Sequence, residues 1–216
     1  MNFPDTLAPR LLEGRLALIT GAGQGNGRTI ALGLAQAGAR VIVTDLNAST
    51  VDETASAIRQ AGGQAWSYVL DVTQADDCHA LAARVADEVG QVDLLVNNAG
   101  IIIRETTSSP RAAANWKKTI DVNVHGTFNV THAWLDAVKA TRGCVINIAS
   151  IAAYAGQAAS LGYAPSKGAI KMLTQSLAQE LAPAGVRVNA LAPGVIATPM
   201  TAATREDPKR LESFMT

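Results

Sequence analysis

The sequence has few of the residues that metal centres, disulfide-bonded domains and nucleic-acid-binding proteins depend on. Its two cysteines, Cys78 and Cys144, have the spacing of neither a metal site nor a disulfide framework, so we expect a reducing, cytoplasmic compartment. Lys and Arg total 18, matched by 18 Asp and Glu, and the basic residues are scattered along the chain. This balance argues against binding to nucleic acid or an anionic membrane and favours a small-molecule partner. No metal site is predicted.

Long apolar runs are also absent. No stretch is long enough to span a bilayer, and the first residues, MNFPDTLAPRLLEG, lack the basic start and apolar core of an export signal. We therefore expect a protein that is neither exported nor embedded in a membrane. The 216 residues fit one domain with one substantial core.

What the sequence does contain is a regular alternation of two patterns. Short runs rich in Val, Ile and Leu alternate with longer, Ala-rich stretches of helical period, as in β–α units around a buried parallel sheet. We predict a single-domain, doubly wound α/β fold of Rossmann type. The predicted strands are 15–20, 40–45, 64–70, 92–97, 144–149 and 186–191, and the predicted helices are 26–37, 49–61, 74–89, 111–140 and 162–181.

The end of the chain is unusual for such a fold. Only one helical stretch follows the sixth predicted strand, and a strand left at the edge of a sheet is usually paired or covered. We therefore expect that a C-terminal piece is missing. Residues 198–216 mix small polar and charged residues before the apolar Leu211, Phe214 and Met215, which predicts a substrate lid.

A glycine-rich turn directly follows the first predicted strand and precedes a helix. Its spacing is Gly-x-x-x-Gly-x-Gly over Gly21, Gly25 and Gly27. Glycine lets the backbone turn tightly and lets a pyrophosphate approach N–H groups at the positive end of a helix. We predict a dinucleotide site here that includes Gln24 and Asn26. On its own the turn is a weak signal, since an unliganded β–α turn has similar residues.

The second predicted strand ends in Asp45, about twenty residues after the glycine turn, where a carboxylate accepts hydrogen bonds from adenosine ribose hydroxyls. A 2′-phosphate would be repelled there, and neither Gln24 nor Leu46, the residue after Asp45, is basic. NAD is therefore predicted rather than NADP. The alternative is that Asp45 is an ordinary turn residue before Asn47.

Tyr163 and Lys167 lie four residues apart at the start of a predicted helix and would share one of its faces. A free tyrosine has a pKa of about 10 and is a poor base at neutral pH, but a neighbouring cation favours its phenolate. We expect an acid–base pair in which Lys167 lowers the pKa of Tyr163. The alternative is two surface residues that merely share a helix face.

Taken in order, these motifs resemble a short-chain dehydrogenase/reductase over nearly the whole chain. The resemblance rests on the turn at 20–27, on the segments 71–72, 97–100 and 193–198, on Asn123, and on Ser150 thirteen residues before Tyr163. By this resemblance Tyr163 is the acid–base residue, Ser150 holds the substrate oxygen and Lys167 also binds the nicotinamide ribose. Asn123 would hold a water linked to Lys167. The further cofactor-binding residues implied are Asp71, Val72, Asn97, Gly194, Ile196 and Thr198.

The resemblance implies an NAD-dependent oxidoreductase that moves a hydride between the cofactor and a secondary alcohol or carbonyl, assembled as a homotetramer. The predicted lid resembles those of polyol-oxidising members, and a 3-oxoacyl thioester or hydroxysteroid substrate is the alternative. Two further classes stay open: a non-catalytic NAD-binding regulator, and an epimerase or dehydratase using the same Tyr and Lys. The intact Ser150, Tyr163 and Lys167 argue against the regulator, and the glycine spacing and short length argue against the other.

Overall fold

All six strands of the sheet are parallel, in the order β3-β2-β1-β4-β5-β6. The computed structural model describes residues 10–156 and 158–206. Chain order reverses direction between β1 and β4, which is the crevice where doubly wound folds bind ligands. The predicted fold class and all six predicted strands are therefore confirmed. The strands are β1 (Leu16–Thr20), β2 (Arg40–Asp45), β3 (Ala65–Val69), β4 (Leu94–Asn97), β5 (Cys144–Ile148) and β6 (Arg187–Leu191).

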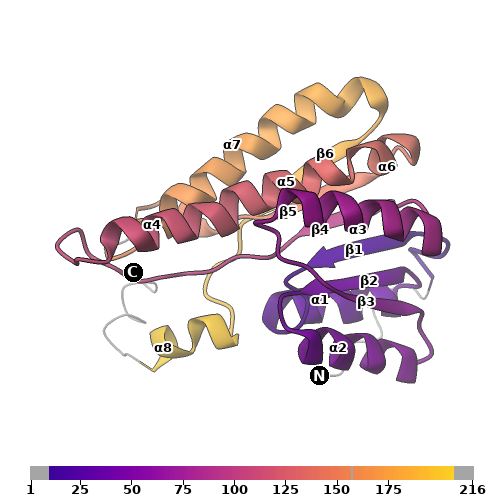
Figure 1. Cartoon of the computed structure of the whole chain (residues 1–216), viewed down its shortest axis with the longest axis horizontal. Helices are drawn as coiled ribbons and strands as arrows, with labels where there is room; N and C mark the ends of the chain where they lie inside the picture. The colour runs from indigo at the N-terminus through magenta and orange to yellow at the C-terminus, as the bar shows by residue number, and fades with distance from the viewer. Residues whose placement is uncertain (1–9, 157, 207–216) are drawn as a thin grey trace.

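Helices cover the sheet on both faces (Figure 1). Side chains alternate along a strand, so Ala17 and Ile19 face one helical layer while Leu16 and Leu18 face the other. The first layer consists of α1 (Gly25–Gln36) and α2 (Ala48–Gln60). The second consists of α3 (Ala75–Glu88), α5 (Gly126–Ala133), α6 (Leu135–Ala140) and α7 (Tyr163–Leu181), and α4 (Ala112–Ile120) packs against α7.

The prediction of one continuous helix over 111–140 is wrong, because the structure divides this stretch into three helices and a π-helical turn. A π-helical turn, Asp121–His125, separates α4 from α5, and a break at Trp134 separates α5 from α6. The Asn123 side chain in the π turn is 1% exposed and bonds to the backbone of Ile101. This contact with a distant loop compensates for the irregular backbone, and π turns recur at functional sites.

Beyond β6, a short 3-10 turn (Pro199–Thr201) leads into α8 (Ala202–Arg205). The rest of the predicted lid, including Leu211, Phe214 and Met215, lies outside the described residues. Within the described ranges, no helix is both long and apolar enough to cross a membrane.

Candidate active site

A cavity lies at the carboxyl ends of the parallel strands, where the segments after all six strands meet. Fourteen of the seventeen residues predicted for the site line it, and three, Gly27, Asn97 and Asn123, do not. The structure thus brings together residues that are far apart in the chain. Those lining the cavity are Gly21, Gln24, Gly25, Asn26, Asp45, Leu46, Asp71, Val72, Ser150, Tyr163, Lys167, Gly194, Ile196 and Thr198.

The glycine turn has the geometry of an anion site. Gly21 and Gly25 have φ angles of +62° and +54°, a backbone region that L side chains rarely adopt. Helix α1 begins at Gly25, and the side chain of its N-cap residue, Gln24, makes no capping hydrogen bond. The first N–H groups of a helix have no partner within it, and here they adjoin the cavity. The turn therefore fits a pyrophosphate.

Gly27 acts behind this turn rather than in the cavity. A Cβ at Gly27 would overlap the carbonyl oxygen of Gly21 and lie 2.5 Å from Nδ2 of Asn98. The absence of a side chain therefore lets α1 approach the turn closely. Gly27 thus shapes the site without lining it.

Asn97 and Asn98 point in different directions, as successive residues at a strand end must. Nδ2 of Asn97 donates to Oγ1 of Thr131 at 2.9 Å and to Oδ1 of Asn147 at 2.8 Å, inside the helical layer. Nδ2 of Asn98 instead donates to the carbonyls of Thr20 and Gly21, at 2.9 and 3.0 Å. Asn97, which was predicted to bind the cofactor, therefore does not line the cavity, whereas the adjacent Asn98 lines it and holds the glycine turn.

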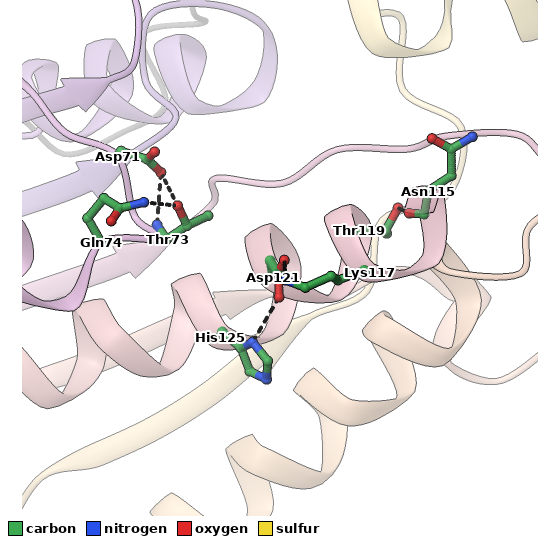
Figure 2. A network of polar contacts seen from close by, with 8 residues as sticks. All are labelled: Asp71, Thr73, Gln74, Asn115, Lys117, Thr119, Asp121 and His125. Carbon is green, nitrogen blue, oxygen red and sulfur yellow. Dashed lines mark hydrogen bonds and ion pairs between the residues drawn. The ribbon is translucent and has the colours of Figure 1, made fainter. Parts of the chain in front are cut away.

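Two carboxylates stand at one end of the cavity, after β2 and β3. Oδ2 of Asp45 accepts from N–H of Gly23 at 3.1 Å, and its Oδ1 accepts from N–H of Asn47 at 3.3 Å. Oδ1 of Asp71 accepts from both the N–H and the hydroxyl of Thr73, at 2.9 and 2.7 Å (Figure 2). Local hydrogen bonds therefore fix the orientation of both side chains.

The predicted catalytic residues meet at the other end. Ser150 follows β5 and its Oγ accepts from N–H of Ala152 at 3.1 Å. Nζ of Lys167 donates to the carbonyl of Ile148 at 2.6 Å and lies 5.7 Å from the centre of the Tyr163 ring. Tyr163 opens α7, so one helix start and one strand end hold all three.

Burial perturbs the pKa values of both Tyr163 and Lys167. Burial raises the pKa of Tyr163 above 10.0, opposed by a hydrogen bond with Ser150 and by the positive charge of Arg104. Burial also lowers the pKa of Lys167 from 10.5 to about 8. That Lys167 lowers the pKa of Tyr163 stays a prediction; in this structure its ammonium group is buried and donates to the carbonyl of Ile148. The acid–base pair is therefore a pair of buried groups with opposite shifts in pKa.

Asn123 lies beneath the catalytic residues. Its Oδ1 accepts from N–H of Ile101 at 2.8 Å, and its Nδ2 donates to the Ile101 carbonyl at 3.0 Å and to Oγ of Ser166 at 2.9 Å. A Cβ at Gly100 would lie 3.2 Å from Oδ1 of Asn123 and 3.7 Å from Nζ of Lys167. Gly100 therefore separates Asn123 narrowly from Lys167.

The outer side of the same π turn is an ion-pair cluster. Figure 2 shows Asp121 between Lys117 and His125, with distances of 2.6 Å to Nζ of Lys117 and 3.2 Å to Nδ1 of His125. These partners lower the pKa of Asp121, the hydrogen bond from Lys117 most of all. The cluster fixes the outer face of the turn while Asn123 fixes the inner one.

Sequence reasoning missed several residues around the cavity. Arg104, in the loop after β4, is close enough to Tyr163 to lower its pKa. Nothing in the local sequence marks this arginine, although its position after a central strand was a usable signal. Residues that line the cavity but were not predicted for the site are Leu70, Ile101, Val122 and Ile148. Among the described residues, no three His, Cys, Asp or Glu side chains form a cluster that could hold a metal ion.

Comparison with known proteins places this geometry in a family. Residues 15–209 match the family model of the short chain dehydrogenases. The chain is 38% identical over 191 residues to the 3-oxoacyl-[acyl-carrier-protein] reductase FabG of Thermotoga maritima, covering 88% of this chain and 77% of that protein. It is 39% identical over 205 residues to the 2-dehydro-3-deoxy-D-gluconate 5-dehydrogenase of Bacillus subtilis, covering 94% and 80%.

A solved relative has the same architecture. The crystal structure of a gluconate 5-dehydrogenase from Burkholderia cenocepacia, in complex with NADP and tartrate, superposes with a TM-score of 0.87 at 36% identity. The match covers 92% of this chain and 78% of that one. The sheet order, the glycine turn and these similarities agree: the chain belongs to the short-chain dehydrogenase family, and it is a nicotinamide-dependent oxidoreductase that transfers hydride between the cofactor and an alcohol or carbonyl substrate.

Proposed function

We propose that the protein is an NAD-dependent dehydrogenase that oxidises a secondary hydroxyl of a polyol. The observation that carries the proposal is a single cavity with two chemically different ends. Toward one end stand the uncapped start of α1, Asp45 and Asp71, and toward the other stand Ser150, Tyr163 and Lys167. The first end suits the adenosine and pyrophosphate of a dinucleotide, and the second suits proton transfer at an alcohol.

In this proposal each part of the chain has a distinct role toward the cofactor. The N–H groups at the start of α1 bind the pyrophosphate, Asp45 binds the adenosine ribose and Lys167 binds the second ribose. Gly194, Ile196 and Thr198 border the position of the nicotinamide, while Asp71 and Val72 border that of the adenine. The bound nicotinamide supplies the hydride acceptor.

Proton transfer then falls to Tyr163. Its phenolate takes the proton of the substrate hydroxyl while Ser150 donates a hydrogen bond to the same oxygen. Burial raises the pKa of Tyr163, and the hydrogen bond with Ser150 and the charge of Arg104 oppose that rise. Lys167 adds positive charge at the site when it is protonated, and Asn123 holds a water that links Lys167 to solvent. In this proposal the proton taken up by Tyr163 then passes to solvent along a path past Lys167.

The preference for NAD rests on charge. Among the described lining residues Lys167 is the single cation, and it lies at the catalytic end, whereas Asp45 and the neutral Leu46 follow β2. A 2′-phosphate beside Asp45 would be repelled, and the ribose hydrogen bonds would be lost. The Burkholderia relative is solved with NADP, so the choice must be measured. We expect NADH to bind at least about tenfold more tightly than NADPH, and tighter NADPH binding would refute the assignment.

The polyol assignment is supported by space and by similarity. A Cβ at Gly194 would meet nothing within 4 Å, which leaves room at the edge of the catalytic end. Two of the relatives are named for activity on gluconates, which are polyhydroxylated. The Thermotoga relative, a 3-oxoacyl reductase, keeps a 3-oxoacyl thioester as the second candidate, ahead of a hydroxysteroid.

A substrate panel tests this assignment. The purified protein would be assayed for NAD reduction with polyols, steroids and simple secondary alcohols, and for NADH oxidation with a 3-oxoacyl thioester. We expect the polyols to be turned over most efficiently. A steroid or thioester at least about a hundredfold better would refute the assignment, and no turnover at all would favour a regulator.

We also propose that the chain is a single catalytic domain in which residues 198–216 form a lid. The support is that Thr198, Pro199, Met200 and Thr201 line the cavity directly after its nicotinamide end. A lid that opens and closes should become protected from proteolysis when cofactor and substrate bind. Equal cleavage with and without ligands would contradict it.

For assembly we propose a homotetramer in a reducing, cytoplasmic compartment. Trp116, Phe128 and Met172, on α4, α5 and α7, are 45–57% exposed, which would suit burial against another subunit. Cys78 and Cys144 are both free and buried, and burial raises the pKa of Cys78 to about 11. Light scattering should give the mass of four chains, and a monomeric mass would contradict the assembly.

A further inference from the structure

The loop after β3 reaches the cavity through Asp71 and Val72, the two residues placed above at the adenine end. Within the loop, Oδ1 of Asp71 accepts from Thr73, and N–H of Gln74 donates to the carbonyl of Asp71 at 3.0 Å (Figure 2 labels these side chains). These bonds shape the turn, but they do not fix it against the helical layer. Its position therefore depends on contacts with a neighbouring helix.

Helix α5 supplies these contacts at two positions. Nδ2 of Asn129 donates to the carbonyl oxygen of Val72 at 3.0 Å. A Cβ at Gly126, three residues earlier, would lie 2.5 Å from Cγ2 of Val72, so the bare backbone of α5 makes room for the valine side chain. Sγ of Cys78 lies 3.9 Å from the same carbonyl, and a thiol is a weak donor. Asn129 is therefore the strong partner of this carbonyl.

The groups of this loop that could meet a cofactor have no partner of their own. Among the described residues, neither the N–H of Val72 nor Oδ2 of Asp71 makes a hydrogen bond. Both residues line the cavity, so adjacent positions offer one donor and one acceptor there. The Watson–Crick edge of adenine carries an amino donor beside a ring-nitrogen acceptor, which is the complementary set.

From this arrangement we propose that Asn129 is a positioning residue for the adenine half of the cofactor. By holding the carbonyl of Val72, it fixes the loop after β3 and, with it, the donor and acceptor that select adenine over another purine. Asn129 does not line the cavity, so it acts through Val72. The inference rests on the placement of adenine at Asp71 and Val72 in the proposed function, and it extends that function by assigning selectivity for the base to α5.

Two cofactors that differ only in the base test the inference. Reduced nicotinamide hypoxanthine dinucleotide has an oxygen where NADH has the 6-amino group, and its N1 carries a hydrogen. Both hydrogen-bonding groups on that edge are therefore reversed. Titration of the wild-type protein, followed by cofactor fluorescence, should show NADH binding about tenfold more tightly, because the hypoxanthine base leaves the donor and the acceptor unpaired.

Variants then assign this preference to Asn129. Asn129→Leu removes the amide donor and should reduce the ratio of the two affinities to about two or less, whereas Asn129→Gln keeps the donor and should retain part of the preference. Gly126→Ala displaces the side chain of Val72 without changing the amide, and it should reduce the ratio as well. A purely structural role would weaken the binding of both cofactors alike and leave their ratio unchanged.

Asn115→Leu is the matched control. Nδ2 of Asn115, on α4, donates to Oε2 of Glu105 at 2.6 Å, so this asparagine also holds a loop from a helix, but the loop is the one after β4. The variant should keep the wild-type ratio. A ratio lost equally in Asn115→Leu would overturn the inference, since the loss would then reflect general loosening of the helical layer.

The other outcomes separate this inference from the proposed function. Equal affinity of the wild type for the two cofactors would overturn it, as would a preference retained in Asn129→Leu, or in Gly126→Ala should the first variant not fold; neither result would touch the oxidation of polyols. A preference lost in Asn129→Leu, together with no oxidation of any polyol, would support the inference and refute the proposed function. Because NADP carries the same base, tighter binding of NADPH would refute the NAD assignment alone.

Discussion

The buried ammonium of Lys167 should make the stability of the cofactor-free protein depend on pH in a specific way. Burial lowers the pKa of Lys167 from 10.5 to about 8 in the folded protein, so the folded state binds the proton on Lys167 more weakly than the unfolded state does. Below the folded value both states are protonated, and the penalty is fully present. As the pH rises from about 8 to 10.5 the penalty disappears, and stability contributed by this site therefore increases with pH.

The size follows from the pKa difference. At about 1.4 kcal/mol per pKa unit the full penalty is about 3 kcal/mol, and about 2.5 kcal/mol of it should vanish between about pH 7 and pH 10. Lys167 is 5% exposed, so solvent screening reduces this little. Lys167→Met keeps the aliphatic stem and removes the charge, and the difference between wild type and variant isolates Lys167 from other titrating groups.

The assay is urea unfolding followed by circular dichroism across this pH range, without cofactor. The wild-type free energy of unfolding should fall relative to Lys167→Met as the pH is lowered from about 10 to 7. Lys171→Met, one turn further along α7 with Nζ 4.2 Å above the ring of Tyr154, is the matched control and should run parallel to wild type. Wild-type and Lys167→Met curves that stay parallel over the whole range would refute the reasoning.

Three further predictions follow from particular contacts. Asp45→Ser should reduce the preference for NADH over NADPH by about tenfold, because it removes the repulsive carboxylate; fluorescence titration with both cofactors measures this, and an unchanged ratio would contradict it. Gly27→Ala should abolish NADH binding, because its Cβ would overlap the Gly21 carbonyl, whereas Gly168→Ala, with open space around the new Cβ, should bind normally. Trp134→Ala should lower the free energy of unfolding by about 3–5 kcal/mol, because Trp134 is 1% exposed and no small side chain fills its volume; urea unfolding would show less than about 1 kcal/mol if the site collapses freely.

The fold was predictable because its signals are local. Each strand is a short apolar run, and glycines with positive φ, such as Gly38 and Gly62, mark the turns after α1 and α2. The π turn at Asp121–His125 has no such signal. Its stabilising contact joins Asn123 to Ile101, 22 residues away, so only the assembled structure shows it.

The candidate site was predictable where residue type alone carries the chemistry. Glycines, Asp45 and the Tyr163–Lys167 pair fall into this class, and the resemblance adds Ser150. The side toward which Asn97 points, and the direction of the pKa shift of Tyr163, depend on packing that the sequence does not express. Arg104 lies in a loop without periodicity, and the bridge between the adjacent Glu105 and Ser160, which holds this loop near the start of α7, joins residues far apart in the sequence.

The most direct test of the account is the turnover of Tyr163→Phe. The variant keeps the ring but cannot exchange the proton, so NAD-dependent oxidation of the best polyol should fall by about a hundredfold or more while NADH still binds. Tyr68→Phe is the control. Tyr68 lies on β3 and does not line the cavity, and its hydroxyl donates to Glu88 at 2.9 Å, so this variant should retain turnover. Near wild-type turnover by Tyr163→Phe would contradict the assignment of Tyr163 as the acid–base group.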